Sequence, residues 1–312
     1  MVAAEKVFVT GGAGFIGMHL IPMLLEAGHS VRVFDNMFRG DRDRMAELIK
    51  ASDGRLELID QDVRYGGSVA AAMRGCDSVI HLAAVSINKS QSDPHESIDI
   101  NMVGNHNVFA AAADQKVRRL VFASSASVYG DPQKMPMHED DQLSPLTPYC
   151  ISKRAGEDLL GYYQRATGLS WIALRFFNVY GPGQKTTAYY TSVINHFVNR
   201  LRNGLPPVID GKGEQSMDFI HVHDIARSIV LALHAESDNV PVNIGTGIDT
   251  TVADLAKILI EAVGVDVEPQ FNPREVLVSR RAADTTRAKE VLGFEPTIAV
   301  GDGMRDLIAS GS

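Results

Sequence analysis

The sequence predicts an α/β protein in which a doubly wound parallel sheet is followed by a smaller α/β lobe. In the first half of the chain, short apolar runs alternate with helical stretches, and a glycine-rich turn joins the first run to the first helix. After residue 178 this alternation loosens, and proline and glycine become frequent. Alternating strands and helices place helices on both faces of a parallel sheet, whereas the irregular remainder suits a second unit packed against the first.

Each element of the first half is predicted from an apolar run or from the helical stretch that follows it. Strands are expected at 6–10, 31–35, 55–60, 77–84, 118–125 and 170–177. Helices are expected at 15–28, 41–51, 67–74, about 94–114 and from Pro148 to about 166. Helices mixed with short strands are expected over 188–203, 222–235, 251–263 and 301–309. The predicted domains are therefore 1–177 and 178–312, with some segments of the second returning to the first.

The composition is that of an ordinary globular protein, with 45% hydrophobic and 22% charged residues in a chain of 312. The net charge of −8 and the lack of a Lys/Arg cluster argue against a nucleic-acid partner. No apolar run approaches the ~20 residues that span a bilayer, and no signal-peptide pattern opens the chain. Cys76 and Cys150 form neither a disulfide framework nor a metal-type spacing. We expect a cytoplasmic protein with no membrane, nucleic-acid or metal partner.

The first strand-to-helix junction predicts a dinucleotide site. Gly11, Gly14 and Gly17 lie in the turn GGAGFIG, where backbone N–H groups and the helix N-terminus can face a pyrophosphate. Asp35 ends the second predicted strand, where a carboxylate can accept both ribose hydroxyls and would repel a 2′-phosphate. This pattern favours NAD over NADP. The alternative is a glycine turn that only permits close helix–strand packing.

Tyr149 and Lys153 predict proton-transfer chemistry. Pro148 suits the first position of a helix, and Tyr149 and Lys153 then lie one turn apart on the same face. A tyrosine with a pKa of about 10 is a poor base at neutral pH, but a nearby ammonium group favours its phenolate. The phenolate could take a proton from a sugar hydroxyl that Ser125 holds. Taken alone, this spacing is common on solvated helix faces.

These motifs and others along the chain resemble the extended short-chain dehydrogenase/reductase family. The similarity is to its NAD-dependent nucleotide-sugar epimerases and dehydratases, most of all to the 4-epimerases of UDP-glucose or UDP-glucuronate. The segments that carry it are TGGAGFIG (10–17), FDN (34–36), QDVR (61–64), HLAA (81–84), NMVGNHNV (101–108), SSASVYG (124–130), YCISK (149–153), RFFNVYGPGQ (175–184), DFIHVHDIA (218–226) and NIGTG (243–247).

The resemblance implies a Rossmann domain that binds NAD, a lobe that binds a UDP-sugar, and a homodimer formed by the helices at about 94–114 and 149–166. It implies Ser125, Tyr149 and Lys153 as the catalytic residues. The cofactor residues that it implies are Gly11, Gly14, Phe15, Ile16, Gly17, Asp35, Asn36, Arg39, Asp62, Val63, Leu82, Ala83, Ala84, Asn101, Tyr149, Lys153 and Phe176. The substrate residues that it implies are Ser125, Ala126, Ser127, Tyr149, Asn178, Arg274 and Arg281.

The residues after Ser125 separate the reactions within this family. Dehydratases carry an Asp-Glu pair there, which assists loss of the 6-hydroxyl, and the sugar-acid decarboxylases carry a glutamate. This chain has Ala126 and Ser127, neither of which can serve as the acid. The expected reaction is therefore 4-epimerisation through a keto sugar. A dehydratase or net oxidoreductase of the same fold, or a non-catalytic dinucleotide-binding subunit, is the alternative.

Two departures from the family pattern concern the substrate. Met217 stands where a phosphate-binding arginine is usual, so Arg274, ten residues before Asp284, is the candidate for that contact. In the same register Arg281 occupies the position that gates the sugar pocket, where it could narrow the pocket or face a sugar carboxylate. The alternative is a slip of one residue that turns Arg280 inward and leaves Arg281 on the surface.

Three histidines are expected to have other roles than metal binding or catalysis. His221 and His223 would share a face of a strand, but the further ligands of a metal site are missing. His81 ends a buried predicted strand, and we expect it to be structural or to lie beside the cofactor.

Overall fold

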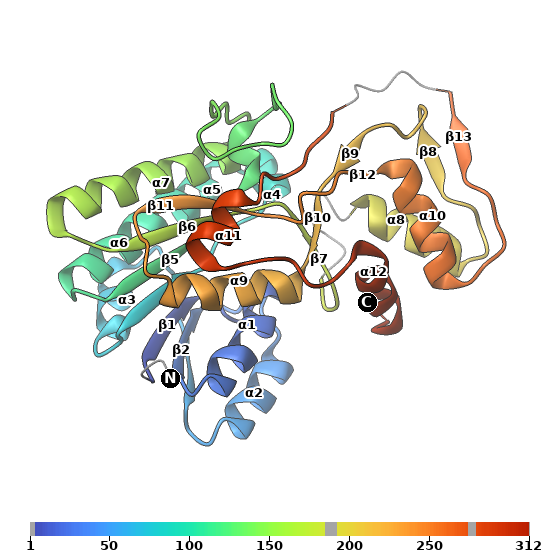
Figure 1. The fold of residues 1–312 in the computed structure, drawn as a ribbon. Coiled ribbons are helices and arrows are strands. Elements are labelled where there is room, and N and C mark those ends of the chain that lie inside the picture. The colour runs from blue at the N-terminus through green and yellow to red at the C-terminus, as the bar shows by residue number, and fades with distance from the viewer. Residues whose placement is uncertain (1–3, 185–191, 274–278, 312) are drawn as a thin grey trace.

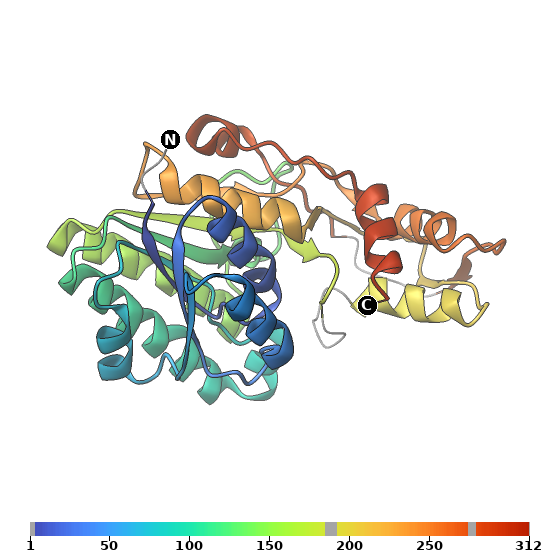
Figure 2. The same ribbon diagram turned by 90° about the horizontal axis from the view of Figure 1, so that it is seen from below.

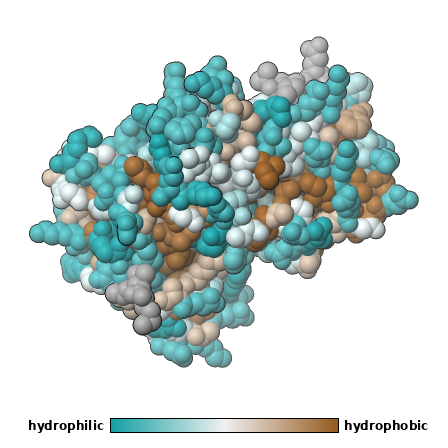
Figure 3. Space-filling view, viewed as in Figure 1, coloured by the Kyte–Doolittle hydropathy of each residue, from teal (hydrophilic) through white to brown (hydrophobic). Residues whose placement is uncertain are grey.

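The computed structural model describes residues 4–184, 192–273 and 279–311. Figure 1 shows a large unit, which contains both the N-terminal strands and the long helices, joined to a smaller lobe on its right. Hydrophilic side chains cover most of the face seen in Figure 3. Within the described ranges, no helix is both long and apolar enough to cross a membrane.

The large unit is built on one parallel sheet of seven strands among the described residues, in the order β11-β6-β5-β4-β1-β2-β3. The strands are β1 (Lys6–Thr10), β2 (Ser30–Asp35), β3 (Leu56–Asp60), β4 (Ser78–His81), β5 (Arg119–Ser125), β6 (Trp171–Phe176) and β11 (Val240–Ile244). The chain moves outward from β1 to β3 and then returns to the other side of β1 with β4. Ligands bind at such a reversal, at the carboxyl ends of the strands. The predicted fold class is confirmed.

Helices cover both faces of the sheet, as Figures 1 and 2 show. One face packs against α1 (Phe15–Glu26), α2 (Arg42–Ala51), α9 (Val222–His234) and α11 (Thr286–Leu292). The other packs against α3 (Gly66–Met73), α6 (Gly104–Asp114) and α7 (Pro148–Thr167). Alternate residues of a strand point to opposite faces, so in β1 Val7 and Val9 join the first core and Phe8 joins the second.

The helix predicted at about 94–114 differs from the prediction. The chain forms α5 (Pro94–Ile98), a π-helical turn at Asp99–Val103, and then α6. In the turn, the amide of Gly104 donates to the carbonyl of Asp99, five residues earlier. The helix remains continuous but gains one residue in this turn, as is common next to functional sites.

The smaller lobe has its own apolar core. Its elements are β8 (Val208–Asp210), β9 (Ser216–Met217), β12 (Thr250–Thr251), β13 (Gln270–Asn272), α8 (Ser192–Arg202), α10 (Val252–Val263) and α12 (Val300–Ala309). The parallel pair β7 (Asn178–Tyr180) and β10 (Phe219–His221) lies where the chain passes between the two units. Because α9, β11 and α11 lie on the large sheet, the chain crosses between the units several times. Helices α4 (Ile87–Ser92) and α11 are not predicted from the sequence.

Candidate active site

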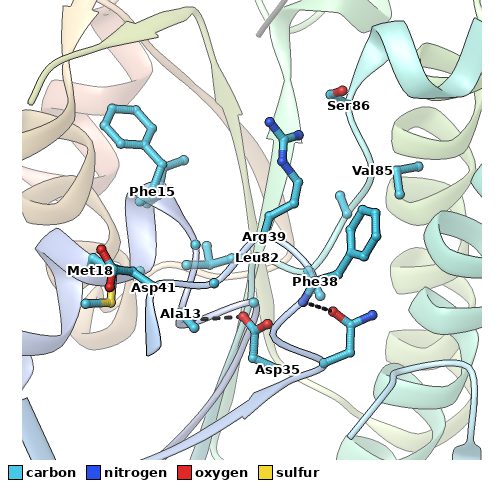
Figure 4. Close-up of a pocket in the computed structure, with 18 of the residues that line it drawn as sticks. Ala13, Phe15, Met18, Asp35, Phe38, Arg39, Asp41, Leu82, Val85 and Ser86 are labelled. Carbon is cyan, nitrogen blue, oxygen red and sulfur yellow. Dashed lines mark hydrogen bonds between the residues drawn. The ribbon is translucent and has the colours of Figure 1, made fainter. Parts of the chain in front are cut away.

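A cavity of about 530 Å³ opens at the carboxyl ends of β1, β2 and β4. Its volume is typical of cofactor sites. Figure 4 shows its side chains converging from the glycine turn, the end of β2 and the segment after β4. The predicted cofactor residues that line it are Gly11, Gly14, Phe15, Ile16, Gly17, Asp35, Asn36, Arg39, Asp62, Val63, Leu82, Ala83, Ala84 and Tyr149. Lining residues that sequence reasoning missed include Phe38, Arg44, Arg64, Ile100 and Gln184.

The glycines of the turn are required by close backbone contacts. Gly11 has a φ of +67°, and a Cβ there would lie 2.6 Å from the amide nitrogen of Ala83. A Cβ on Gly17 would lie 2.3 Å from the carbonyl oxygen of Gly12. Helix α1 begins immediately after Gly14, which has no side chain to cap it. The first amides of α1 are therefore available to the oxygens of a pyrophosphate.

Asp35 ties the glycine turn to the end of β2. The amide of Ala13 donates to its Oδ2 at 3.0 Å (Figure 4). The amide of Met37 donates to its Oδ1 at 2.9 Å. Burial raises the pKa of Asp35, and the two backbone hydrogen bonds oppose this shift. Each carboxylate oxygen keeps a further lone pair, so both can still accept from ribose hydroxyls. The sequence predicts only the ribose contact and does not indicate the bond to Ala13.

Asp62 and Val63 border the same cavity beyond β3. Asn36 donates from Nδ2 to Asp62 Oδ2 at 2.9 Å, and Arg64 pairs with both carboxylate oxygens, at 2.9 Å and 2.8 Å. Burial alone would raise the pKa of Asp62, but the hydrogen bonds from Arg64 and Asn36 lower it overall. Asp62, predicted as a cofactor residue, is therefore an ionised and fixed acceptor at the border of the cavity.

Asn101 does not line the cavity but holds the segment that does. Its Oδ1 accepts from the amide of Val85 at 2.8 Å, and its Nδ2 donates to the Val85 carbonyl at 3.2 Å. The π-helical turn aims this side chain at the segment after β4. Asn101, predicted as a cofactor residue, therefore affects the cavity indirectly, because it fixes the backbone of Val85.

His81 is a structural residue. Its imidazole is buried between Thr10 Oγ1 at 2.6 Å and Asn105 Oδ1 at 2.8 Å. Burial lowers the pKa of His81 to about 3, and the ring is therefore neutral at neutral pH. Since both nitrogens have partners inside the protein, His81 fixes the end of β4 and does not act as a base.

Tyr149 and Lys153 lie in the first turns of α7. Thr147 caps this helix by accepting from the amide of Cys150, and Pro148 occupies the first position as predicted. The Lys153 ammonium lies 5.5 Å from the centre of the Tyr149 ring and donates to the carbonyl of Ala123 at 2.7 Å. Lys153 is only 3% exposed, so a solvated helix face is ruled out.

Lys153 is shielded from solvent. Burial lowers the pKa of Lys153 to about 7, and Glu157, one turn further along α7, opposes this shift. Glu157 itself is held by Arg175 at 2.7 Å and by the hydroxyl of Ser124 at 2.5 Å. The buried ion pair of Glu157 and Arg175 therefore fixes α7 one turn beyond Lys153.

Ser125 ends β5 beside a second cavity of about 220 Å³. Its Oγ accepts from Ser127 Oγ at 2.9 Å and from the Ser127 amide at 3.2 Å. Tyr149 borders both cavities, so the two adjoin at this residue. The predicted substrate and cofactor residues that line the second cavity are Ser125, Ala126, Ser127, Tyr149, Phe176, Asn178 and Arg281.

The structure also separates the two candidate arginines. Arg281 lines the second cavity, whereas Arg280 is exposed and pairs with Asp249. The one-residue slip that would turn Arg280 inward is therefore wrong. Met217 lies in β9, and Arg274 falls outside the described residues.

His223 lies in α9 rather than on a strand, so His221 and His223 do not share a strand face. Among the described residues, no group of three or more His, Cys, Asp or Glu side chains could hold a metal ion.

A glycine turn with Asp35 at the reversal of a parallel sheet, beside Ser125, Tyr149 and Lys153, is typical of a dinucleotide-dependent enzyme. The chain belongs to the NAD dependent epimerase/dehydratase family, whose model matches residues 7–245. The predicted family and NAD as the cofactor are thereby confirmed.

Two proteins and one solved structure are similar to the chain over nearly its whole length. The chain is 34% identical over 308 residues to a putative UDP-glucose 4-epimerase of Methanocaldococcus jannaschii, covering 97% of each chain. It is 31% identical to UDP-glucuronic acid decarboxylase 1 of Arabidopsis thaliana, covering 97% of this chain and 69% of the relative. A structure of the UDP-N-acetylglucosamine 4-epimerase of Methanobrevibacter ruminantium M1, in complex with UDP-N-acetylmuramic acid, superposes with a TM-score of 0.90. Its identity is 28%, and 99% of each chain is covered.

Proposed function

We propose that this enzyme is a UDP-sugar 4-epimerase, which oxidises the sugar at C4 and then reduces it from the opposite face. One observation carries the proposal. Among the described residues that line the cavity at Ser125 and Tyr149, none is an aspartate or a glutamate. Elimination of a sugar hydroxyl needs an acid that protonates the leaving oxygen. Ala126 and Ser127 supply none, whereas oxidation and re-reduction at one carbon require no such acid.

Tyr149, Lys153 and Ser125 each have a separate role in the proton transfer. Tyr149, as a phenolate, takes the proton of the C4 hydroxyl and returns it when the sugar is reduced. The Lys153 ammonium, held on the Ala123 carbonyl, lowers the energy of that phenolate. Ser125 accepts a hydrogen bond from Ser127 and so keeps its own proton to donate to the sugar oxygen. When bound, NAD supplies the acceptor and donor of the hydride at C4.

The names of the relatives support UDP as the nucleotide, since both the epimerases and the decarboxylase act on UDP-sugars by name. Asn178 lies in the second cavity, with its Nδ2 donating to the Asp218 carbonyl at 2.9 Å. Nδ2 carries a second hydrogen, which we assign to an oxygen of the sugar diphosphate, together with Arg274. Assembly as a homodimer and action in the cytoplasm are part of the proposal.

The test is turnover of a small panel of substrates: UDP-glucose, UDP-galactose, UDP-glucuronate and UDP-galacturonate. Each is incubated with the enzyme and NAD, and the product is identified by chromatography and mass spectrometry. We expect a 4-epimer of unchanged mass and no steady release of NADH. Tyr149→Phe is the matched control, because it keeps the ring and removes the proton acceptor.

Three results would overturn the proposal. A product lighter by one water would make the enzyme a dehydratase, and a product lighter by carbon dioxide would make it a decarboxylase. One NADH released per product would make it a net dehydrogenase.

Tyr149→Phe should lose at least 100-fold in kcat, in line with the roughly 10²–10⁴-fold contribution of a general base.

A further inference from the structure

The cavity beside Ser125 contains an arginine whose charge is poorly neutralised. Of the described residues that line this cavity, Arg281 is the one with a fixed charge, and the others are apolar, hydroxyl or amide residues. Its side chain is 19% exposed. A guanidinium in such a place is costly unless an anion pairs with it.

The available partner for Arg281 is weak. Asp131 is its one ionic partner among the described residues, with 3.6 Å between Arg281 Nη2 and Asp131 Oδ1. This separation is too long for a good hydrogen bond. The Asp131 side chain is 64% exposed, so water can replace it at little cost. The guanidinium is therefore available to a second anion that enters the cavity.

Hydrogen bonds anchor the backbone segment that follows Arg281. The amide of Met137 donates to the carbonyl of Ala282 at 2.8 Å, and the amide of Asp284 donates to the carbonyl of Met137 at 2.8 Å. The amide of Ala283 donates to the buried carboxylate of Asp218 at 3.0 Å. These bonds hold the backbone that follows Arg281, so the point from which its side chain enters the cavity is fixed.

The size of the cavity and its lining limit which part of a substrate can meet Arg281. The cavity, about 220 Å³, is smaller than the roughly 300–1,000 Å³ of drug-sized sites, and this suits one sugar ring. If Ser125 and Tyr149 hold the C4 hydroxyl, the C5 substituent is adjacent to the reacting carbon. The diphosphate on C1 is then attached at the opposite side of the ring.

We infer that the sugar of the preferred substrate carries a carboxylate on C5, so that the substrate is a UDP-hexuronate. This inference rests on the proposed 4-epimerase function. The planar guanidinium matches a carboxylate with two parallel hydrogen bonds, which a neutral hydroxymethyl group cannot accept in the same way. Ser127, in the same cavity, offers a small side chain that leaves room for this group.

The experiment compares kcat/KM for UDP-glucuronate and UDP-glucose in the parent, in Arg281→Gln and in Arg280→Gln. The parent should convert the uronate at least as well as the neutral sugar. In Arg281→Gln the uronate-to-glucose ratio should fall roughly 10- to 100-fold, as expected for the loss of a charge-assisted hydrogen bond. Arg280→Gln is the matched control, since its side chain is exposed and pairs with Asp249, and the ratio should stay at the parental value.

A third variant, Arg281→Lys, keeps the charge and removes the planar pairing, and we expect an intermediate ratio. It also decides the matter if Arg281→Gln does not fold. The affinity for UDP, measured by calorimetry, tests whether Arg281 binds the diphosphate or the sugar, because UDP contains the diphosphate and lacks the sugar. If Arg281 held the diphosphate, UDP affinity and both substrates would fall together.

Specific results overturn the inference. The first is that UDP-glucuronate is inert while UDP-glucose is converted. The second is that neither Arg281 variant changes the uronate-to-glucose ratio of kcat/KM. The third is that the Arg281 variants lose affinity for UDP in parallel with activity on both substrates. Failure of the underlying function looks different, because no UDP-sugar in the panel would then yield a 4-epimer of unchanged mass.

Discussion

Lys153 is almost fully buried although its side chain can carry a charge. Its ammonium group donates to the carbonyl of Ala123 and lies 5.0 Å from the centre of the Phe122 ring. Burial lowers the pKa of Lys153 to about 7. A lysine that loses its proton near neutral pH is well suited to exchange protons with a tyrosine beside it.

This shift predicts how stability depends on pH. Between about pH 7 and pH 10 the unfolded chain keeps the Lys153 proton, whereas the native protein loses it, so this group makes the protein more stable as pH rises. Lys153→Met lacks this contribution. The free energy of unfolding of the parent, relative to Lys153→Met, should increase by on the order of a few kcal/mol over that range. Urea unfolding at several pH values, without NAD, measures it, and parallel curves would show that the buried ammonium stays charged.

At the same scale, sequence reasoning identified residue types but not their detailed geometry. The spacing of Tyr149 and Lys153 and the position of Asp35 predict the site because helical and strand periodicity fix where such side chains point. The bond between Asp35 and the Ala13 amide depends on how the turn folds back, which no local pattern encodes. The choice between Arg280 and Arg281 likewise depends on bonds to Asp218 and Met137, far away in the sequence.

At the scale of single elements, the π-helical turn before α6 places Gly104 next to a residue of the site. Gly104 ends the turn, and a Cβ there would lie 2.7 Å from Cγ2 of Val63, which lines the cavity at the carboxyl ends of β1, β2 and β4. Valine is stiff about its first side-chain torsion and cannot simply rotate away. The periodicity of residues 94–114 predicted one regular helix because a single inserted residue changes the apolar pattern very little.

Gly104→Ala should therefore destabilise the protein by about 1–3 kcal/mol through overpacking, and it should weaken NAD binding by displacing Val63. Gly67→Ala, in α3, is the matched control. A Cβ at Gly67 meets nothing within 4 Å, and alanine in a helix is favoured over glycine by roughly 0.5–1 kcal/mol. Chemical unfolding and NAD titration of both variants check this. Equal stability of the two variants would show that the close approach to Val63 carries no cost.

The α5-to-α6 segment and α7 also present apolar side chains to solvent. Ile98 and Val103 are 49% and 43% exposed, and Ile151 and Tyr162 on α7 are 48% and 56% exposed. Exposed apolar side chains gathered on neighbouring elements are typical of an interface. They support the predicted homodimer formed by these helices.

Light scattering should give twice the monomer mass of 33.9 kDa. Ile151→Glu should shift the protein toward the monomer, since it places a charge in the proposed interface. Ile248→Glu is the control, because Ile248 is 65% exposed but lies outside these helices. A parent protein that scatters as a monomer at working concentration contradicts the dimer.

At the scale of the whole molecule, the topology brings the site together. The turn after β1, the ends of β2 and β3, the segment after β4, Ser125 at the end of β5 and Tyr149 at the start of α7 all meet at one edge of the sheet. Strand alternation predicts this edge, because parallel strands share their direction. The repeated crossings between the two units were only partly predictable, since α9, β11 and α11 pack on the sheet by long-range contacts.

In the proposed reaction, C4 of the sugar loses and regains its hydrogen within one catalytic cycle. The most direct measurement follows a UDP-sugar that carries deuterium at C4, with mass spectrometry and NMR of the product. A 4-epimerase should give a 4-epimer of unchanged mass that keeps the deuterium at C4, with no accumulation of NADH. Loss of the label from C4, with release of labelled NADH or a product lighter by water or carbon dioxide, would contradict it.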